Sequence, residues 1–395
     1  MLTRRAFVRM LGAAGPALVL AACGAGAPAA PATGSAVPAS SAAASGASAQ
    51  PPASASVSAA GSSVAPASAV PGTYKPTPMS PAVKVKVGSY GFVTEIGIFS
   101  AIDNGYFSSE GLDVELLPTT GSTDVVGPIT TNQLQFVSPS PDPGLFNASA
   151  RDITVKIVGF EAITNETSQQ AGFMVRQDLL DSGRYKEPKD LKGFNIGQAG
   201  TPGGQSDVLL ERWTAKGGLT RNDVTRTPLP FPQMPAAMAN KAVDAVMTIE
   251  PFITVMEGQG VAKLVMPSGQ LFPGLPGGIL VMSPGFAKDQ PEAAKRFLAA
   301  FLRGQRDFWH AFVKKDTPPD EMFKIIANHT PFKQPRQVGR ATTYTVNPNG
   351  EMPLNALSDE VDAYVRFGSV KQKPDLSQIV DPSFAKAAVE LIGKV

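Results

Sequence analysis

The segments Val83-Lys-Val-Lys-Val87 and Leu112-Asp-Val-Glu-Leu116 decide the fold class. A turn and a stripe of apolar residues separate them along the chain. Both segments alternate apolar and polar residues, which is the pattern of a half-buried β-strand. The stripe between them has the spacing of one helix face and consists of Ile96, Phe99 and Ile102. A strand, a helix and a second strand in this order predict parallel strands joined by a crossover helix.

The same alternation of strands and helices continues along the chain. Further strands are predicted at Gln135–Val137, Ile153–Val158, Gly172–Arg176, Phe194–Gly197, Ala242–Met247, Ala262–Val265 and Gly278–Met282. A long helix should follow Asp289, which can cap it, with Pro291 in its first turn and Glu292 completing a capping box. The aromatic stripe from Phe297 to Phe312 is interpreted as core packing. The pattern predicts an α/β fold with largely parallel strands.

The composition excludes several classes of protein. The chain has 395 residues with a formal net charge of +2. This near balance gives no indication of a basic surface that would bind nucleic acid. One cysteine and two histidines exclude a disulfide framework and leave little for a zinc site. No cofactor is predicted.

The first 23 residues predict an export signal. Basic residues that include the pair Arg4-Arg5 precede a short apolar run, and the run ends in Leu20-Ala-Ala-Cys23. The arginine pair resembles a twin-arginine signal and the tetrad resembles a bacterial lipobox, which implies that Cys23 carries a lipid and becomes the mature N-terminus. The alternatives are an ordinary cleaved signal and a membrane-spanning anchor, but the apolar run is shorter than the ~20 residues that a spanning helix needs.

Residues 24–80 predict a disordered tether. The segment consists mainly of Ala, Ser, Pro, Gly and Val, with no aromatic residue before Tyr74 and no charge before Lys75. Such a composition buries too little apolar surface to offset the entropy of ordering the chain. We therefore expect a folded body that begins near residue 82 and is held away from a membrane by this segment.

The folded body resembles the SsuA/THI5-like (NMT1-like) solute-binding proteins of ABC importers. The motifs that carry this resemblance are Gly105-Tyr-Phe107, Glu110-Gly-Leu-Asp-Val-Glu115, Asp190-Leu-Lys-Gly193, Met234–Asn240, Val243-Asp-Ala245, Glu250-Pro251 and Gln290-Pro-Glu292. The resemblance implies a type II periplasmic-binding-protein-like fold with two lobes, a hinge and an interlobe cleft. Lobe 1 would comprise residues 82–176 and 279–395, and lobe 2 residues 177–278. It also implies an extracytoplasmic, monomeric receptor that delivers a small-molecule solute to a permease and ATPase complex.

Ligands of open α/β sheets bind beyond the carboxyl ends of the strands, and this rule selects candidate site residues. In lobe 1 they are Ser89, Tyr90, Phe92, Ser138, Ser140, Asp142 and Glu161, and in lobe 2 Thr201, Gln205, Ser206, Phe231 and Glu250. The backbone N–H groups of Gly203-Gly204 form either a site for an anion or carbonyl oxygen at a helix start, or a plain glycine-rich connection.

Carboxylates dominate this set, and Glu250 is the acid most expected to contact the solute, with Asp142 and Glu161 as further candidates. Up to three carboxylates without an obvious arginine favour an amine, a pyrimidine or another donor-bearing ring over sulfonate or nitrate. Aromatic side chains at Tyr90, Phe92 and Phe231 would stack on such a ring. The alternative is that each carboxylate caps a turn or is solvated.

Three other functions remain open. The chain could bind anions such as sulfonate, taurine or nitrate, or serve as a surface sensor. It could also be a pyrimidine-synthesising enzyme of the THI5-like type, which uses histidines. Because His310 and His329 lie in C-terminal helical or loop segments and not at strand ends, we predict that the protein is not an enzyme.

Overall fold

The computed structural model describes residues 74–119, 124–149, 155–332 and 338–395. The predicted signal, the lipidation site Cys23 and residues 24–73 of the predicted tether lie outside this part of the chain. Among the described residues, no helix combines the length and the hydropathy that a bilayer crossing requires.

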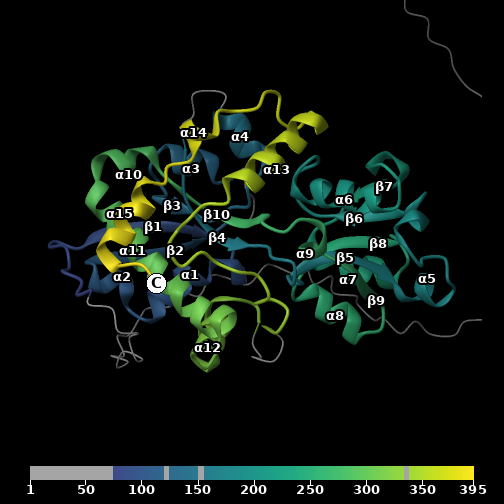
Figure 1. Cartoon of the computed structure of the whole chain (residues 1–395), viewed down its shortest axis with the longest axis horizontal. Coiled ribbons are helices and arrows are strands. Elements are labelled where there is room, and N and C mark those ends of the chain that lie inside the picture. The colour runs from purple at the N-terminus through teal and green to yellow at the C-terminus, as the bar shows by residue number, and fades with distance from the viewer. Residues whose placement is uncertain (1–73, 120–123, 150–154, 333–337) are drawn as a thin grey trace, which may run out of the picture. The chain divides into compact units, whose positions relative to one another are not determined.

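Two five-stranded sheets form the framework (Figure 1). The first has the strand order β2-β1-β3-β10-β4, with β1 Val83–Ser89, β2 Leu112–Pro118, β3 Phe136–Val137, β4 Lys156–Ile163 and β10 Pro276–Met282. The second has the order β7-β6-β8-β5-β9, with β5 Ala171–Arg176, β6 Asn195–Gln198, β7 Thr225–Pro228, β8 Ala245–Ile249 and β9 Ala262–Pro267. The two sheets share one topology, which confirms the predicted α/β architecture with two lobes.

Each sheet contains parallel and antiparallel pairs. The strand β1 pairs in parallel with β2 and β3, and β6 does so with β7 and β8. In contrast, β10 runs antiparallel to β3 and β4, and β5 runs antiparallel to β8 and β9. The prediction of largely parallel pairing is therefore wrong for β5 and β10. Each of these strands enters its sheet directly after the chain has crossed from the other sheet, and alternation within a strand carries no information on its direction.

The crossings between the sheets lie earlier in the chain than the sequence predicted. Because β5 belongs to the second sheet, the first crossing falls at residues 164–170 and not at 175–177. The second crossing falls at residues 272–275, just before β10, and not at 278–280.

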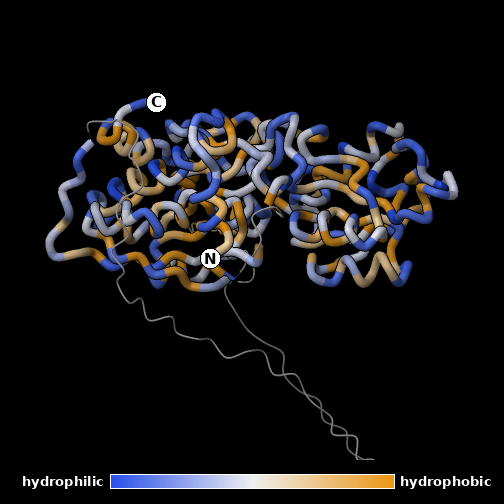
Figure 2. The backbone as a smooth tube through the Cα atoms, turned by 90° about the horizontal axis from the view of Figure 1, so that it is seen from below, coloured by the Kyte–Doolittle hydropathy of each residue, from blue (hydrophilic) through white to orange (hydrophobic). Residues whose placement is uncertain are grey.

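Helices cover the faces of both sheets. The most apolar segments of the chain lie in the interior (Figure 2). The α-helices are α1 Ile96–Asp103, α2 Tyr106–Ser109, α3 Val126–Thr130, α4 Pro143–Ser149, α5 Gln177–Asp181, α6 Gln205–Lys216, α7 Met234–Ala239, α8 Phe252–Gly258, α9 Ser268–Leu271, α10 Pro284–Asp289, α11 Pro291–Phe308, α12 Asp320–His329, α13 Leu354–Phe367, α14 Leu376–Ile379 and α15 Ser383–Ile392. Short 3-10 turns are η1 Val93–Glu95, η2 Pro188–Leu191, η3 Arg221–Asp223 and η4 Phe231–Gln233, and η5 Trp309–Lys314 is a π-helix.

The long helix α11 supports the first sheet. Its aromatic side chains Phe297, Phe301 and Phe308 are buried, as the core interpretation of the stripe predicted. Pro291 stands in the first turn, but Gln290 is the N-cap and no side chain caps the helix. The predicted cap at Asp289 is wrong because that residue is the last one of α10.

The first described residues pack on the first lobe. The Tyr74 hydroxyl donates a hydrogen bond to Glu110 at 2.9 Å, and the Met79 amide donates to the Glu110 carbonyl at 3.1 Å. Gly111 has a φ of +75°, and a Cβ there would lie 2.2 Å from the Met79 nitrogen. Residues 74–80, which the sequence assigned to the tether, thus contact the folded body.

Helix α13 connects the two sheets (Figure 1). The Tyr364 ring lies 6.1 Å from that of Phe146 in α4, while Arg366 pairs with Glu211 in α6 at 2.7 Å. One hydrophobic cluster includes buried residues of both sheets together with Leu357 of α13. The sequence analysis predicted no helix here.

Candidate functional site

Two serine–glutamate pairs lie at the carboxyl ends of adjacent strands. The hydroxyl of Ser89, the last residue of β1, donates to Glu95 Oε2 at 2.5 Å, and the Ser138 hydroxyl after β3 donates to Glu161 Oε1 at 2.5 Å. The parallel register that pairs Gly88 with Val137 makes the two serines neighbours. Both glutamates are buried, so the end of the first sheet holds two carboxyl groups beneath its loops.

Glu161 occupies an irregular position in the sheet. The register pairs Ala162 with Gly278 and Phe160 with Ile279, which leaves Glu161 as the extra residue of a β-bulge. Bulges redirect side chains and occur often beside functional sites. Glu161 Oε1 is bonded to Ser138, whereas Oε2 is buried without a hydrogen-bond partner among the described residues.

The opposing strand leaves room for this carboxyl group. A Cβ at Gly278 would lie 2.8 Å from Glu161 Oε2, so the oxygen faces a position without a side chain. On the helix side, Gln305 donates to the Phe160 carbonyl at 2.7 Å and to the Glu161 carbonyl at 3.3 Å. Helix α11 therefore holds the backbone of the bulge, while Oε2 of Glu161 has no hydrogen-bond partner among the described residues.

Burial shifts the acidity of both glutamates. Desolvation raises the pKa of Glu95 to about 7, although Ser89 and the amides of Tyr90 and Phe92 donate hydrogen bonds to its charged form. Desolvation and the nearby charge of Glu95 raise the pKa of Glu161 well above its usual range. Two carboxyl groups this close and this buried do not both ionise easily without a positive partner.

The other predicted residues of the first lobe differ in exposure and in their partners. The rings of Tyr90 and Phe92 stack with centroids 6.0 Å apart, and Phe92 is 43% exposed. Ser140 is exposed. Asp142 caps the start of α4, because its Oδ1 accepts from the Gly144 amide at 2.8 Å. Asp142 therefore fits the alternative reading of a capping carboxylate.

Gln205 of the second lobe reaches the first sheet. Its amide nitrogen donates to the Pro276 carbonyl at 2.8 Å and to Glu360 Oε1 at 2.9 Å. The Tyr364 hydroxyl donates to the same oxygen of Glu360 at 2.5 Å. Burial raises the pKa of Glu360 to about 8. This second buried acid stands on α13.

The glycine-rich turn before α6 uses its own backbone donors. The Gly203 amide donates to Asp207 Oδ2 at 2.6 Å, and the Gly204 amide donates to the carbonyl of Thr201, whose side chain is exposed. The Ser206 hydroxyl donates to the Ala199 carbonyl at 3.0 Å. Because Asp207 accepts from the Gly203 amide and the Thr201 carbonyl accepts from the Gly204 amide, the turn fits a structural connection better than an anion site.

Glu250 also has local partners. Its carboxylate accepts from the Thr254 hydroxyl at 2.9 Å and from the Thr254 amide at 3.2 Å, in the first turn of α8. Arg340 lies 3.9 Å from Glu250 and 2.6 Å from Glu257. Phe231 stacks on Phe252 with ring centroids 6.3 Å apart. The acid most expected to contact solute is thus a helix cap, and Phe231 packs beside the same helix.

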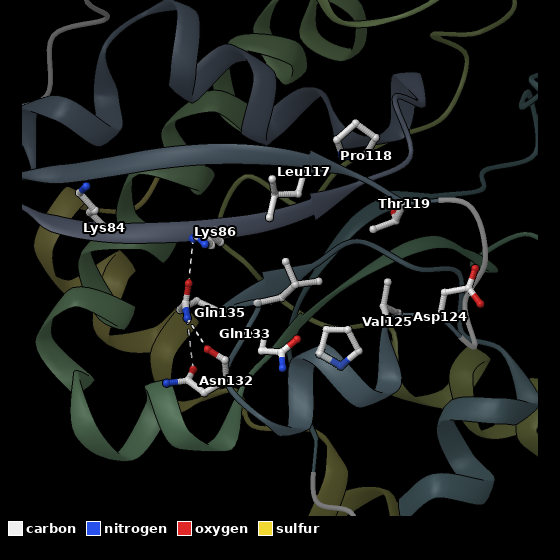
Figure 3. Close-up of a pocket in the computed structure, with 12 residues that line it drawn as sticks. Lys84, Lys86, Leu117, Pro118, Thr119, Asp124, Val125, Asn132, Gln133 and Gln135 are labelled. Atoms are coloured by element: carbon white, nitrogen blue, oxygen red, sulfur yellow. Dashed lines mark hydrogen bonds between the residues drawn. The ribbon is translucent and has the colours of Figure 1, made fainter. Parts of the chain in front are cut away.

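A hollow of about 800 Å³ lies elsewhere, between the exposed faces of β1 and β2 and helix α3 (Figure 3). Lys84 and Lys86 line one side of it, and Gln135 and Asn132 line the other. Gln135 Oε1 accepts from the Lys86 amide at 2.8 Å, and its nitrogen donates to the Asn132 carbonyl at 2.8 Å. The predicted site residues do not line this hollow.

Sequence reasoning missed Glu95 and Glu360. Glu95 stands three residues after Phe92, where a glutamate can reach back to free N–H groups at a helix start, and this spacing was a usable signal. Glu360 gave no such signal, because its role depends on packing against Gln205, which is 155 residues away in the chain.

The two histidines pair with aspartates outside the strand ends. His310 Nδ1 lies 2.7 Å from Asp316, and His329 Nε2 lies 2.7 Å from Asp103 with its ring stacked on Phe99. Within the described ranges, no group of three or more His, Cys, Asp or Glu side chains is arranged to hold a metal ion.

Comparisons with known proteins identify relatives over most of the folded body. The family described as NMT1/THI5 like matches residues 94–310, more than half of the chain. The nitrate/nitrite binding protein NrtA of Nostoc sp. is 23% identical over 65% of this chain and 59% of its own length. The formylaminopyrimidine-binding protein of Halalkalibacterium halodurans is 28% identical over 30% of this chain and 34% of its own length.

Solved structures share the fold at lower identity. The periplasmic nitrate-binding protein NrtA of Synechocystis PCC 6803 superimposes with a TM-score of 0.64 at 16% identity, covering 79% of this chain and 89% of its own. The desulfurization enzyme DSZB also superimposes, with a TM-score of 0.56 at 14% identity, covering 78% of this chain and 99% of its own. The chain spans about three fifths or less of the curated relatives' lengths.

Proposed function

This chain belongs to the NMT1/THI5-like family, and we propose that it is the extracytoplasmic solute receptor of an ABC importer. In this proposal the two lobes close on a small organic molecule without altering it, and the closed form delivers the molecule to a permease and ATPase complex. A lipid on Cys23 holds the monomeric receptor at the membrane. Solute capture by closure requires only that the solute contacts both lobes more favourably in the closed form.

The observation that carries the proposal is the pairing of two like sheets through two short crossings. Each sheet ends in loops that bear hydroxyl, carboxyl and aromatic groups, as at Ser89, Ser138 and Phe92. Two α/β units joined by two short crossing segments can form a hinge, and ligands of such sheets bind beyond the strand ends. The two curated relatives described above are binding proteins by name, which supports a receptor and not an enzyme.

The charges at the strand ends favour a nitrogen-bearing solute. Glu95 and Glu161 are buried there without a salt bridge among the described residues, whereas Arg340 is already paired with Glu257. A pyrimidine, a thiamin-precursor-like compound or another donor-bearing ring fits this environment and would stack on Tyr90 or Phe92. The formylaminopyrimidine-binding relative supports the same class.

The anion-binding relatives support a competing ligand class. Nitrate and sulfonate require cationic or N–H donors, and the N–H groups of Gly203 and Gly204 are engaged by other groups of the turn. An enzyme of the same fold requires a reactive group at the strand ends, and His310 and His329 are committed to aspartates elsewhere. These contacts favour the nitrogenous solute and the receptor function.

A ligand panel with a conformational readout tests the proposed function. Thermal shift is measured with pyrimidines, flavins, polyamines, sulfonates and nitrate, and small-angle scattering is recorded with each compound that stabilises the protein. We expect one compound class to raise the melting temperature and to reduce the radius of gyration. If no class stabilises the protein and the scattering envelope never changes, or if a compound is converted to product, the receptor proposal fails.

A further inference from the structure

The most unusual group at the strand ends is the carboxyl of Glu161. It is fully buried, it stands at a bulge, and one of its oxygens has no partner among the described residues. A buried polar atom without a partner is destabilising, so such atoms call for an explanation. A bound group that donates a hydrogen bond to Oε2 would remove this cost.

The surroundings of Glu161 define which group fits. Ser138 already donates to Oε1, and Glu95, with its own serine donor, contributes the nearest negative charge. The Tyr344 hydroxyl is the other titratable group that senses Glu161, and it donates to the Val93 carbonyl. Burial raises the pKa of both carboxyl groups, and a cationic group at Glu161 Oε2 would supply the positive partner that stabilises the ionised form.

The geometry points to a binding subsite formed by the Ser89–Glu95 and Ser138–Glu161 pairs. In this subsite Glu161 Oε2 accepts a hydrogen bond from an N–H or ammonium group of the solute. This inference rests on the proposed receptor function and adds the residue that sets its charge selectivity. Glu95 holds the loop at residues 89–92 in place, because its Oε1 accepts from the Tyr90 and Phe92 amides. Glu161 is then the acceptor, and Glu95 is the positioning residue.

The second serine–glutamate pair lies close to the carboxyl ends of its strands. Ser138 and Glu161 lie within three residues of the ends of β3 and β4, and the glycines at 277 and 278 place no side chain on the opposing strand. The neighbouring Ser140 and Phe92 are exposed.

The test is isothermal titration calorimetry with 4-aminopyrimidine and putrescine as donors and with nitrate and ethanesulfonate as anions. We expect the donors to bind the wild-type protein more tightly than the anions. In Glu161→Gln, affinity for putrescine should fall about tenfold, because the amide cannot ionise beside a bound ammonium group as the carboxyl group can. Glu110→Gln is the matched control. Glu110 is likewise buried and bonded to a hydroxyl, that of Tyr74, but it precedes β2 at the opposite end of the sheet, so donor affinity should not change.

A second variant covers the case in which Glu161→Gln does not fold. Ser138→Ala removes the hydroxyl that orients the Glu161 carboxyl and should lower donor affinity several-fold. Unchanged donor affinity in both folded variants, or anion binding that outcompetes the donors, would overturn the subsite while the receptor function stands. If no probe binds and no probe changes the scattering curve, the receptor function falls together with the subsite.

Discussion

Glu161 and Glu250 are both buried glutamates at strand ends, yet their oxygens have different partners. Both oxygens of Glu250 accept from Thr254, which makes the side chain a cap for α8. Glu161 has one serine partner and one oxygen without a partner in the described residues. At the residue scale, the oxygen without a partner distinguishes Glu161 from Glu250, whose carboxylate holds the start of a helix.

This difference predicts the effect of Glu250→Gln. The amide keeps the side-chain length but replaces one acceptor oxygen with a donor that faces a Thr254 donor. We expect the free energy of unfolding to fall by about 1 kcal/mol. Solute affinity should stay within about twofold of the wild type, and the measurements are urea denaturation and calorimetry. A loss of affinity by 1.4 kcal/mol or more, the factor of about ten expected of a solute contact, would return Glu250 to the binding site.

At the element scale, the sequence predicted most strands but not their directions. The alternation in β1 and β2 is a property of consecutive residues, so it is visible without the fold. The antiparallel direction of β5 and β10 depends on where the chain crosses between sheets. The candidate site was likewise predicted only in part. The rule that ligands bind at strand ends selected Ser138 and Glu161, whereas Glu360 lies on α13 and depends on long-range packing.

Helix α13 makes stability depend on pH through Glu360. The ordinary glutamate pKa is 4.5 and burial raises the pKa of Glu360 to about 8, so the folded protein favours the protonated acid. Its contribution to the free energy of unfolding is full below pH 4.5 and is lost as the pH rises toward 8. We expect the wild-type protein to lose stability across this window in urea denaturation.

Glu360→Gln isolates that contribution. Glutamine is neutral at every pH and can still accept from the Tyr364 hydroxyl through its carbonyl oxygen. The variant should lose less stability than the wild type between pH 4.5 and 8, with a remaining slope from other buried acids whose pKa values are also raised, Glu95 and Glu161 among them. Identical slopes in the variant and the wild type would show that Glu360 does not titrate in this range.

At the scale of the whole molecule, one hydrophobic cluster joins the two sheets. It contains Ile157 of the first sheet, Phe173 of the second and Leu357 of α13, all fully buried. A receptor that closes around a solute must keep its lobes connected while they rotate. A shared cluster supplies that connection, and it also implies that neither lobe is an independent folding unit.

The two tryptophans test this implication, because Trp213 lies in α6 of the second lobe and Trp309 lies in η5 of the first. In Trp309→Phe only the second lobe reports by fluorescence, and in Trp213→Phe only the first does. We expect the fluorescence transition of each variant to coincide with its own circular dichroism transition in urea, since cooperative unfolding moves all probes together. Leu357→Ala should lower both midpoints, with a loss of about 2–5 kcal/mol, because it opens a cavity in the shared cluster. If the Trp213 and Trp309 signals separated from circular dichroism, or if only one midpoint moved in the Leu357→Ala background, the lobes would fold independently and α13 would belong to one of them.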